Sequence, residues 1–391
     1  MPIAYRLYRP SDAEQVNDLA HRVFHLAPFS GAVWQRMEEH DHLTVVAAEG
    51  DKVIGAIPFN LRDFLLRPGL SIRSAFAHMV CVDASYRSRG IGSGMMELAK
   101  EHLPQLCQAM FVYTGVEGKP PYTFYEKNGF VDLHYSRFYS LTHPQAAASP
   151  DVQVSPFDPA LVGEDHLNAA YQRAFPLHAG FPVHSPGYWQ RAIASIIYVE
   201  IPAELWIATL ARGSDLVGYA IFGYIRGDVT VLELAASPSE PGLAVKLLQA
   251  VVAAAVSRGV SLVNMLAGVH HPAVSSLLEL GFQPNPRSRA DVVAGLALRF
   301  DLLWEKLTRG EPPFSLEIWT PTHTLSFPGP GKPFTLEMKE STLHRLFLCR
   351  EHLSAALQAE RITSPTLDLP LETLQSIFQP APWVFHWLEW I

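Results

Sequence analysis

The 391-residue sequence has few cysteines and no long apolar run. Cys81, Cys107 and Cys349 lie far apart, in an odd number and without metal-ligand spacing, so they make a poor disulfide framework and indicate a reducing compartment. The most apolar run, around residues 247–256, is shorter than the roughly 20 residues that a bilayer-spanning helix needs. The first residues, MPIAYRLYRP, lack the apolar core of a signal peptide. These absences predict a cytoplasmic protein without membrane insertion.

Basic charge is also scarce, with 30 basic against 38 acidic side chains and a formal net charge of −8. A nucleic-acid-binding protein usually shows a basic surplus, so we expect no nucleic-acid partner. Hydrophobic residues make up 48% of the chain and charged residues 17%, which is typical of a globular protein. At about 150 residues per domain, the length predicts two or three domains.

The sequence contains an internal repeat, covering about residues 1–145 and 150–300. The matched positions are Trp34 and Trp189, Gly55 and Gly218, Gly90 and Gly242, and Gly129-Phe130 and Gly281-Phe282. The last two pairs share one offset of 152 residues (242 − 90 and 282 − 130). Each match alone could arise by chance, but four in one order indicate a duplication.

Each copy has the pattern of an α/β layer. In the first copy we expect helices at 11–24, 90–103 and 121–129, and strands at 43–49, 52–59, 75–82, 109–115 and 136–142. The tail from about residue 305 predicts strands, a Pro-Gly loop and two helices. The predicted fold class is therefore α/β (α+β): two tandem domains of mixed β-sheet flanked by helices, at 1–147 and 148–302, and a small α+β domain at 303–391.

The stretch YRSRGIGSG, residues 86–94, predicts a binding site for a diphosphate. A helix that starts at Gly90 presents unpaired N–H groups, glycines let an anion approach the backbone, and Arg87 adds charge-assisted contacts. The alternative is a plain helix start with exposed arginines. Two familiar phosphate motifs do not fit, because Ser93-Gly94 follows Gly92 where a P-loop needs Gly-Lys, and Met95 replaces the third Rossmann glycine.

Two motifs resemble the GNAT acyltransferase superfamily. The segment VCVDASYRSRGIGSGMM is similar to its acetyl-CoA motif, Arg/Gln-x-x-Gly-x-Gly/Ala, and FYEKNGF is similar to its Tyr-x-x-x-Gly-Phe segment. The matching residues are Arg87, Gly90 and Gly92 in the first motif and Tyr125, Gly129 and Phe130 in the second. One departure is Ala84, where many members have proline, and it affects the turn rather than the chemistry.

The resemblance implies acetyl-CoA as co-substrate, no metal, and a role for each matched residue. The backbone of the strand would pair with the pantetheine arm, and the amides of the glycine turn would bind the pyrophosphate. The implied cofactor-binding residues are Val80, Cys81, Val82, Arg87, Ser88, Arg89, Gly90, Ile91, Gly92 and Ser93. Tyr125 would protonate the departing thiolate; the alternative is a residue that only packs against Phe124 and Phe130.

The attacking amine must lose a proton, so a general base is expected. Glu117 follows the strand at 109–115 and could reach the cleft; alternatively it is a solvated loop carboxylate. Asp83 and Glu126 are weaker candidates. His78 precedes the glycine turn on a strand, where we expect a core histidine with its hydrogen bonds satisfied.

The second copy is a degraded version of the first. Arg87, Arg89, Gly92 and Tyr125 correspond to Ser239, Pro241, Ala244 and Leu277. Because the cation, one donor and the acid are lost together, we expect a structural copy that does not bind acetyl-CoA. The neighbouring histidines at 270 and 271 have no nearby third ligand, so they indicate a loop and not a metal site.

Two GNAT-like copies followed by an α+β tail resemble the enhanced-intracellular-survival type of acetyltransferase. That resemblance implies a sterol-carrier-protein-like third domain, acetylation of amines such as aminoglycosides, a hexamer, and a terminal carboxylate, here that of Ile391, as base. The closing segment LETLQSIFQPAPW carries the likeness. Two departures are GVEGKPPYTFY, which lacks the family's Ser-Glu pair, and Ile391 in place of phenylalanine. The aromatic residues of WVFHWLEWI could instead anchor the tail to the core or to a subunit interface.

The function predicted from these residues is acetyl-CoA-dependent N-acetylation of a primary amine on a small molecule or peptide, by direct attack on the thioester. The acidic net charge fits a cationic acceptor. The alternative is an acyl-CoA-binding sensor or scaffold without turnover. Tyr125 favours the enzyme, since a sensor has no need of an acid beside the sulfur.

Overall fold

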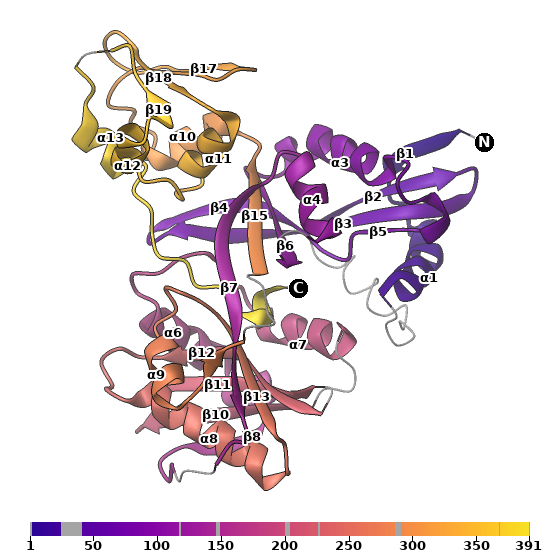
Figure 1. The fold of residues 1–391 in the computed structure, drawn as a ribbon, viewed down its shortest axis with the longest axis vertical. Helices are drawn as coiled ribbons and strands as arrows, with labels where there is room; N and C mark the ends of the chain where they lie inside the picture. Colours follow the sequence, from indigo (N-terminus) through magenta and orange to yellow (C-terminus); the bar gives the residue numbers. More distant parts are fainter. Residues whose placement is uncertain are drawn as a thin grey trace. The chain divides into compact units, whose positions relative to one another are not determined.

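A computed structural model describes residues 2–24, 41–116, 119–145, 149–199, 204–225, 227–285, 291–366 and 368–390. The chain forms two compact units (Figure 1). The first consists of Met1–Leu19, Met37–His134 and Val292–Pro382, and the second of Ala20–Arg36, Tyr135–Asp291 and Trp383–Ile391. The domain boundaries expected at 147 and 302 remain predictions.

The first unit contains a mixed sheet with the strand order β1-β2-β3-β4-β6-β15, followed by the first part of β7. The strands are β1 (Ile3–Leu7), β2 (His42–Glu49), β3 (Lys52–Arg67), β4 (Leu70–Ala77), β5 (Cys81–Val82), β6 (Ala109–Val116), β7 (Val131–Thr142) and β15 (Asp291–Ala297). The helices are η1 (Pro10–Asp12), α1 (Ala13–Phe24), η2 (Ala84–Tyr86), α3 (Ile91–His102), η3 (Leu103–Gln105) and α4 (Pro120–Lys127). Apolar residues of β2, β3, α3 and α4 share one core, which positions the glycine turn.

The single strand expected at 75–82 is divided in two. β4 pairs in parallel with β6 up to Ala77, whereas Cys81 and Val82 of β5 pair with β3. Between them Met79 has a φ of 48°, a left-handed conformation that is strained for a residue with a Cβ. The chain therefore turns away from β6 just before the glycine stretch.

The second unit repeats this plan, with the strand order β7-β13-β12-β11-β10-β8. Its further strands are β8 (Gln153–Pro156), β9 (Phe181–Pro182), β10 (Glu204–Arg212), β11 (Asp215–Ile225), β12 (Asp228–Ala236), β13 (Leu262–Gly268) and β14 (Gln283–Pro284). Its helices are α5 (Pro159–Val162), α6 (Glu164–Ala174), α7 (Tyr188–Val199), α8 (Leu243–Ser257), α9 (Val274–Glu279) and η4 (Trp387–Trp390).

The repeat is visible in the backbone angles. Gly90 and Gly242 have φ values of 76° and 74° and each precedes the first residue of a long helix. Gly129 and Gly281, which follow the next helix in each copy, have φ values of 88° and 86°. In each copy a left-handed glycine precedes one helix and another follows the next helix, at the same offset of residues. Unrelated segments would not share this arrangement.

The carboxyl-terminal part of the first unit holds a second sheet, as the α+β tail predicts. Its order is β17-β16-β18-β19, with β16 and β18 parallel. The elements are α10 (Phe300–Leu307), β16 (Leu316–Trp319), β17 (Thr324–Phe327), β18 (Phe334–Met338), α11 (Glu340–Phe347), α12 (Leu353–Gln358), β19 (Ile362–Thr363) and α13 (Leu371–Ile377). The helix α11 has no counterpart among the expected elements.

The last residues of the chain are anchored in the core of the second unit. Trp383 and Phe385 are buried, and the Val384 amide donates to the carbonyl oxygen of Ala179 at 2.7 Å. The Trp387 ring packs edge-on against Phe138, with 5.1 Å between the ring centroids. The expectation that these aromatic residues hold the tail against the core is thus confirmed.

No helix in the described part of the chain is both long enough and apolar enough to cross a bilayer.

Two glycines of the second unit test the anchoring of Trp383. Gly180 and Gly213 both have positive φ, but a Cβ on Gly180 would overlap the Trp383 side chain, whereas a Cβ on Gly213 would meet nothing. Both Gly→Ala variants incur the left-handed strain of about 1–2 kcal/mol. We expect Gly180→Ala to lose about 1–3 kcal/mol more through overpacking. Urea unfolding followed by tryptophan fluorescence measures this, and equal losses for the two variants would contradict the packing.

Candidate functional site

The second part of the divided strand, β5, lies directly ahead of the glycine turn. Among the described residues, β3 is the strand that pairs with β5, through Gly55 with Val82 and Ala56 with Cys81. A strand has two edges, so a further strand could be added to Cys81–Val82 only along the edge that faces away from β3. This edge can accept an extended, amide-containing chain as an added strand.

The turn after β5 leads into the start of α3. Asp83 accepts hydrogen bonds from the Ser85 amide (3.0 Å) and hydroxyl (2.6 Å), which fixes the short helix η2. Ser88 and Gly90 then adopt φ values of 61° and 76°. The first backbone bond of α3 runs from the Gly94 amide to the Gly90 carbonyl oxygen at 2.9 Å.

This geometry exposes the positive end of α3. The amides of residues 91–93 precede the first intrahelical hydrogen bond, so they have no partner within the helix. Gly90 is exposed, and a Cβ built on it would meet no atom within 4 Å, so the space beside the residue that precedes these amides is open. The start of α3 therefore has the geometry that the predicted anion site requires.

Two guanidinium groups lie in the residues that lead into α3. Arg87 is exposed and its Nε donates to the Val82 carbonyl oxygen at 3.3 Å. The Arg89 guanidinium lies 5.2 Å from the centroid of the Tyr86 ring, and Tyr86 in turn donates to a Glu49 oxygen at 2.6 Å. Both positive charges thus stay near the helix start without a direct carboxylate partner in the recorded ion pairs of the described residues.

The start of α3 packs closely on α4, the helix that carries Tyr125. A Cβ on Gly92 would lie 2.8 Å from Cε2 of Phe124, so glycine is needed here for contact as well as for access. Asn128 at the end of α4 donates to the Phe124 carbonyl oxygen at 2.7 Å and lies 3.5 Å from the Ser93 hydroxyl. The glycine turn and the tyrosine helix therefore form one packed structure.

Tyr125 is a buried acid in this structure. Its side chain is 6% exposed, and its ring packs edge-on against Phe124 and Phe130, at centroid distances of 5.0 and 5.4 Å. Burial raises the pKa of the Tyr125 hydroxyl. No hydrogen bond to this hydroxyl is recorded from any described residue. The packing predicted as the alternative role is present, and the hydroxyl keeps its proton at neutral pH.

Of the four candidates for the general base, two lie within the described residues. Glu117 and Ile391 lie outside the described residues. Glu126 is exposed, and Asp83 is engaged in capping η2.

The expectation for His78 is wrong in one respect. The residue is buried, with 7% of its surface exposed, but neither ring nitrogen has a hydrogen-bond partner among the described residues. Burial, together with the nearby charges of Arg62 and His42, lowers the pKa of His78 to about 3, so the imidazole is neutral. A histidine beside a left-handed Met79 at a divided strand is a feature that the sequence pattern alone did not reveal.

The corresponding region of the second copy keeps the helix start and loses the rest. Gly242 opens α8 in the same conformation as Gly90, but Pro241 has no N–H, and the Ser239 hydroxyl is engaged with that of Ser237 at 2.8 Å. Leu277, at the position of Tyr125, is fully buried. A cavity of about 220 Å³ remains here, lined in part by Pro241, Gly242 and Ala244.

Comparisons with known proteins show what the sequence and the fold are similar to. Residues 3–130 match the model of the acetyltransferase (GNAT) family. In structure the chain is similar to a probable N-acyltransferase from Enterococcus faecalis (13% identity, TM-score 0.73, 98% of this chain and 99% of that chain covered). It is also similar to a GCN5-related N-acetyltransferase from Anabaena variabilis (15% identity, TM-score 0.72, 98% and 99% covered) and to Eis1 from Mycobacterium abscessus (12% identity, TM-score 0.60, 97% and 98% covered).

No curated protein matches the sequence at a significant level. Within the chain, the segment 3–130 is the part that is similar to the GNAT acetyltransferase family. The three structural neighbours extend the likeness of fold over nearly the whole chain. The resemblance of the tail to a sterol-carrier protein remains a prediction.

The duplication provides a matched test of the glycine turn. Gly90→Ala and Gly242→Ala place a methyl group in open space at nearly equal φ, so each should lower stability by about 1–2 kcal/mol. Relief of that strain displaces the amides of residues 91–93, so we expect Gly90→Ala alone to weaken acetyl-CoA binding, by up to roughly tenfold. Calorimetric titration with acetyl-CoA measures this. Equal losses of affinity in both variants would refute a site confined to the first copy.

Proposed function

We propose that the protein is an acetyl-CoA-dependent N-acetyltransferase that modifies a primary amine of a small molecule or peptide. One observation carries the proposal: the short strand β5 (Cys81–Val82) runs directly into a glycine-initiated helix start, within a segment that matches the GNAT family model. A pantetheine arm has amides that suit the strand edge, and a pyrophosphate suits the helix start. The residues present therefore fit acetyl-CoA along its length.

The binding roles follow from position. Val80, Cys81 and Val82 offer main-chain groups to the pantetheine arm. The amides of Arg89–Ser93 and the side chains of Arg87 and Ser88 would hold the diphosphate, with Gly90, Ile91 and Gly92 shaping the turn. When bound, acetyl-CoA supplies the acyl group as a thioester.

The protein's own residues would manage the protons of the transfer. In the net reaction a C–N bond forms between the amine and the acetyl carbon, the C–S bond breaks, one proton leaves the amine and one reaches the thiolate. The Tyr125 hydroxyl is protonated at neutral pH because burial raises its pKa, and it can donate that second proton. For the first proton we propose Glu117 or the terminal carboxylate of Ile391, as the resemblance implies.

The alternative is an acyl-CoA-binding sensor without turnover. It keeps the strand edge and helix start but needs no acid at Tyr125. Release of free thiol from acetyl-CoA, followed with DTNB across a panel of primary amines, separates the two functions. Binding of acetyl-CoA without thiol release on any amine would favour the sensor, and amine-dependent release supports the enzyme.

The role of Tyr125 is tested by Tyr125→Phe. The substitution keeps the ring that packs against Phe124 and Phe130 and removes the proton donor, so we expect turnover to fall about 10²–10⁴-fold while acetyl-CoA affinity is unchanged.

The matched control is Tyr122→Phe on the same helix, which removes a hydroxyl that donates to Asp132 at 2.9 Å and should leave turnover near wild type. Steady-state rates and acetyl-CoA titrations measure both quantities. A fully active Tyr125→Phe enzyme would end the acid assignment.

A further inference from the structure

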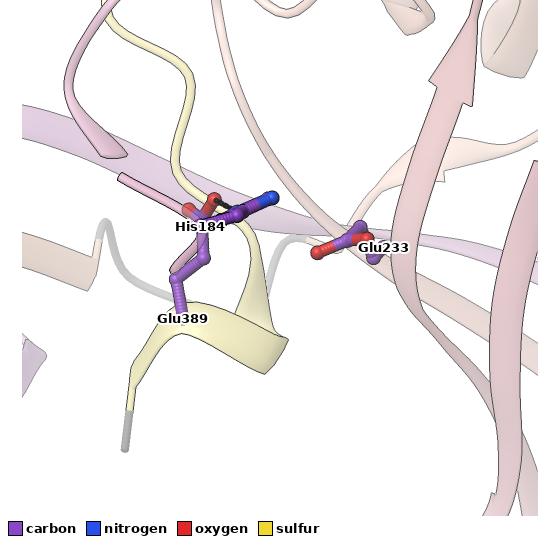
Figure 2. A group of neighbouring side chains, drawn as sticks. All are labelled: His184, Glu233 and Glu389. Carbon is purple, nitrogen blue, oxygen red and sulfur yellow. Dashed lines mark ion pairs between the residues drawn. The ribbon is translucent and has the colours of Figure 1, made fainter. Parts of the chain in front are cut away.

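Three side chains that could bind a metal ion converge inside the second unit (Figure 2). His184 follows β9, Glu233 lies on β12, and Glu389 belongs to η4 near the end of the chain. One ligand atom from each residue lies within 4.8 Å of the other two. Figure 2 shows the Glu233 carboxylate and the His184 ring pointing toward one another, with the Glu389 carboxylate beside the ring. The sequence alone does not reveal this group, because its three residues are far apart along the chain.

The two carboxylates of this group have no lysine or arginine partner among the described residues. Glu233 and Glu389 are both fully buried, and within the described part of the chain no lysine or arginine forms an ion pair with either. The recorded ion pairs of Glu389 are with histidines, to His184 Nε2 at 3.8 Å and to His386 Nδ1 at 3.6 Å. Burying negative charge without a compensating cation is costly, so a cation bound between the two carboxylates would stabilise the group.

Neighbouring donors hold the carboxylates in place. Glu233 Oε1 accepts hydrogen bonds from Trp189 Nε1 (3.0 Å) and from the Tyr219 hydroxyl (2.6 Å). Glu389 Oε1 accepts from the Tyr171 hydroxyl at 2.6 Å, and its Oε2 accepts from the His386 amide at 2.8 Å. Such outer donors orient carboxylate ligands around metal ions.

Two of the three residues have side-chain atoms without a hydrogen-bond partner in the described part of the chain. Glu233 Oε2 and both ring nitrogens of His184 are buried and unpartnered among the described residues. The His184 side chain is 2% exposed, and its ring stacks on Tyr188 with a centroid distance of 4.0 Å. An unpartnered buried polar group costs about 1–3 kcal/mol, so several in one place point to a ligand between them.

We propose that His184, Glu233 and Glu389 bind one divalent transition-metal ion, of which Zn²⁺ fits best. One imidazole nitrogen and two carboxylate oxygens are ligands that zinc accepts, with a fourth position left for water. Zinc bonds of about 2.0–2.2 Å place tetrahedral ligand atoms roughly 3.4 Å apart, so the present separations close by small side-chain rotations. The ion neutralises both carboxylates and fastens the carboxyl-terminal segment to β12. The proposal is independent of acetyl transfer, and it departs from the sequence-based expectation of no metal.

The test uses the full chain without a polyhistidine tag, because such a tag binds zinc itself. The protein is stripped with EDTA and titrated with ZnCl₂ by calorimetry, and its thermal unfolding is followed with and without the metal. We expect one Zn²⁺ per chain and a midpoint that rises with zinc, since a ligand that binds only the folded state stabilises it. Glu233→Gln and His184→Asn should each weaken zinc binding at least about 100-fold.

Two controls match these variants. Glu351→Gln removes a buried carboxylate of the first unit that is paired with Arg345 and Arg361, and His178→Asn removes a half-buried imidazole of the second unit. Both should bind zinc like the wild type. The proposal is overturned if the stripped wild type binds no zinc and its unfolding midpoint does not move, or if binding survives both Glu233→Gln and His184→Asn.

A readout on the wild type covers the case in which a variant does not fold. X-ray absorption at the zinc edge should show a first shell of nitrogen and oxygen with one imidazole. A shell that contains sulfur, several imidazoles or none would overturn the proposal.

Discussion

The left-handed backbone at Gly90 is the constraint on which the proposed site depends. It lets the chain pass from η2 into α3 without a side chain just ahead of the amides of residues 91–93, and the space around Gly90 is open. The second constraint lies just upstream, where the left-handed Met79 divides β4, which pairs with β6, from β5, which pairs with β3. The left-handed residues Met79 and Gly90 follow one another along the chain, so the proposed binding surface consists mainly of main-chain groups. The shape of such a surface depends on its glycines and on close packing behind it, which Gly92 provides by its contact with Phe124.

The second copy shows which parts of this design belong to the fold and which belong to the chemistry. Gly242 and Gly281 keep their left-handed conformation and the apolar core around α8 is complete, so the fold does not need Arg87, Arg89 or Tyr125. What the second copy lacks is the charge, the N–H at Pro241 and the hydroxyl, which are the groups that the proposed acyl-CoA site uses. Its interior also contains the group His184, Glu233 and Glu389, and among the described residues no such group of potential metal ligands is found in the first copy. A duplicated domain released from one role can thus keep its architecture and carry different chemistry.

The sequence was informative where structure is local. Helix starts, the turn at residues 49–51 and the glycines at 90 and 129 follow from short-range rules of capping and conformation, and all of them are present. The division of the strand at Met79 could not be predicted, because it depends on whether β3 or β6 offers the better pairing at that point. The unsatisfied state of His78 and the convergence of His184, Glu233 and Glu389 depend on packing between distant segments, which no local pattern records. The aromatic tail was predictable in its anchoring role, since large apolar rings need burial, but the place of Glu389 among those rings was not.

Hydrogen exchange of the full chain with and without acetyl-CoA tests the central claim most directly, because it observes main-chain amides rather than side chains. The account predicts that acetyl-CoA slows exchange in a peptide that covers residues 87–94 and leaves the matching peptide of the second copy, 239–246, unchanged. Absence of protection at 87–94, or equal protection in both peptides, would contradict it.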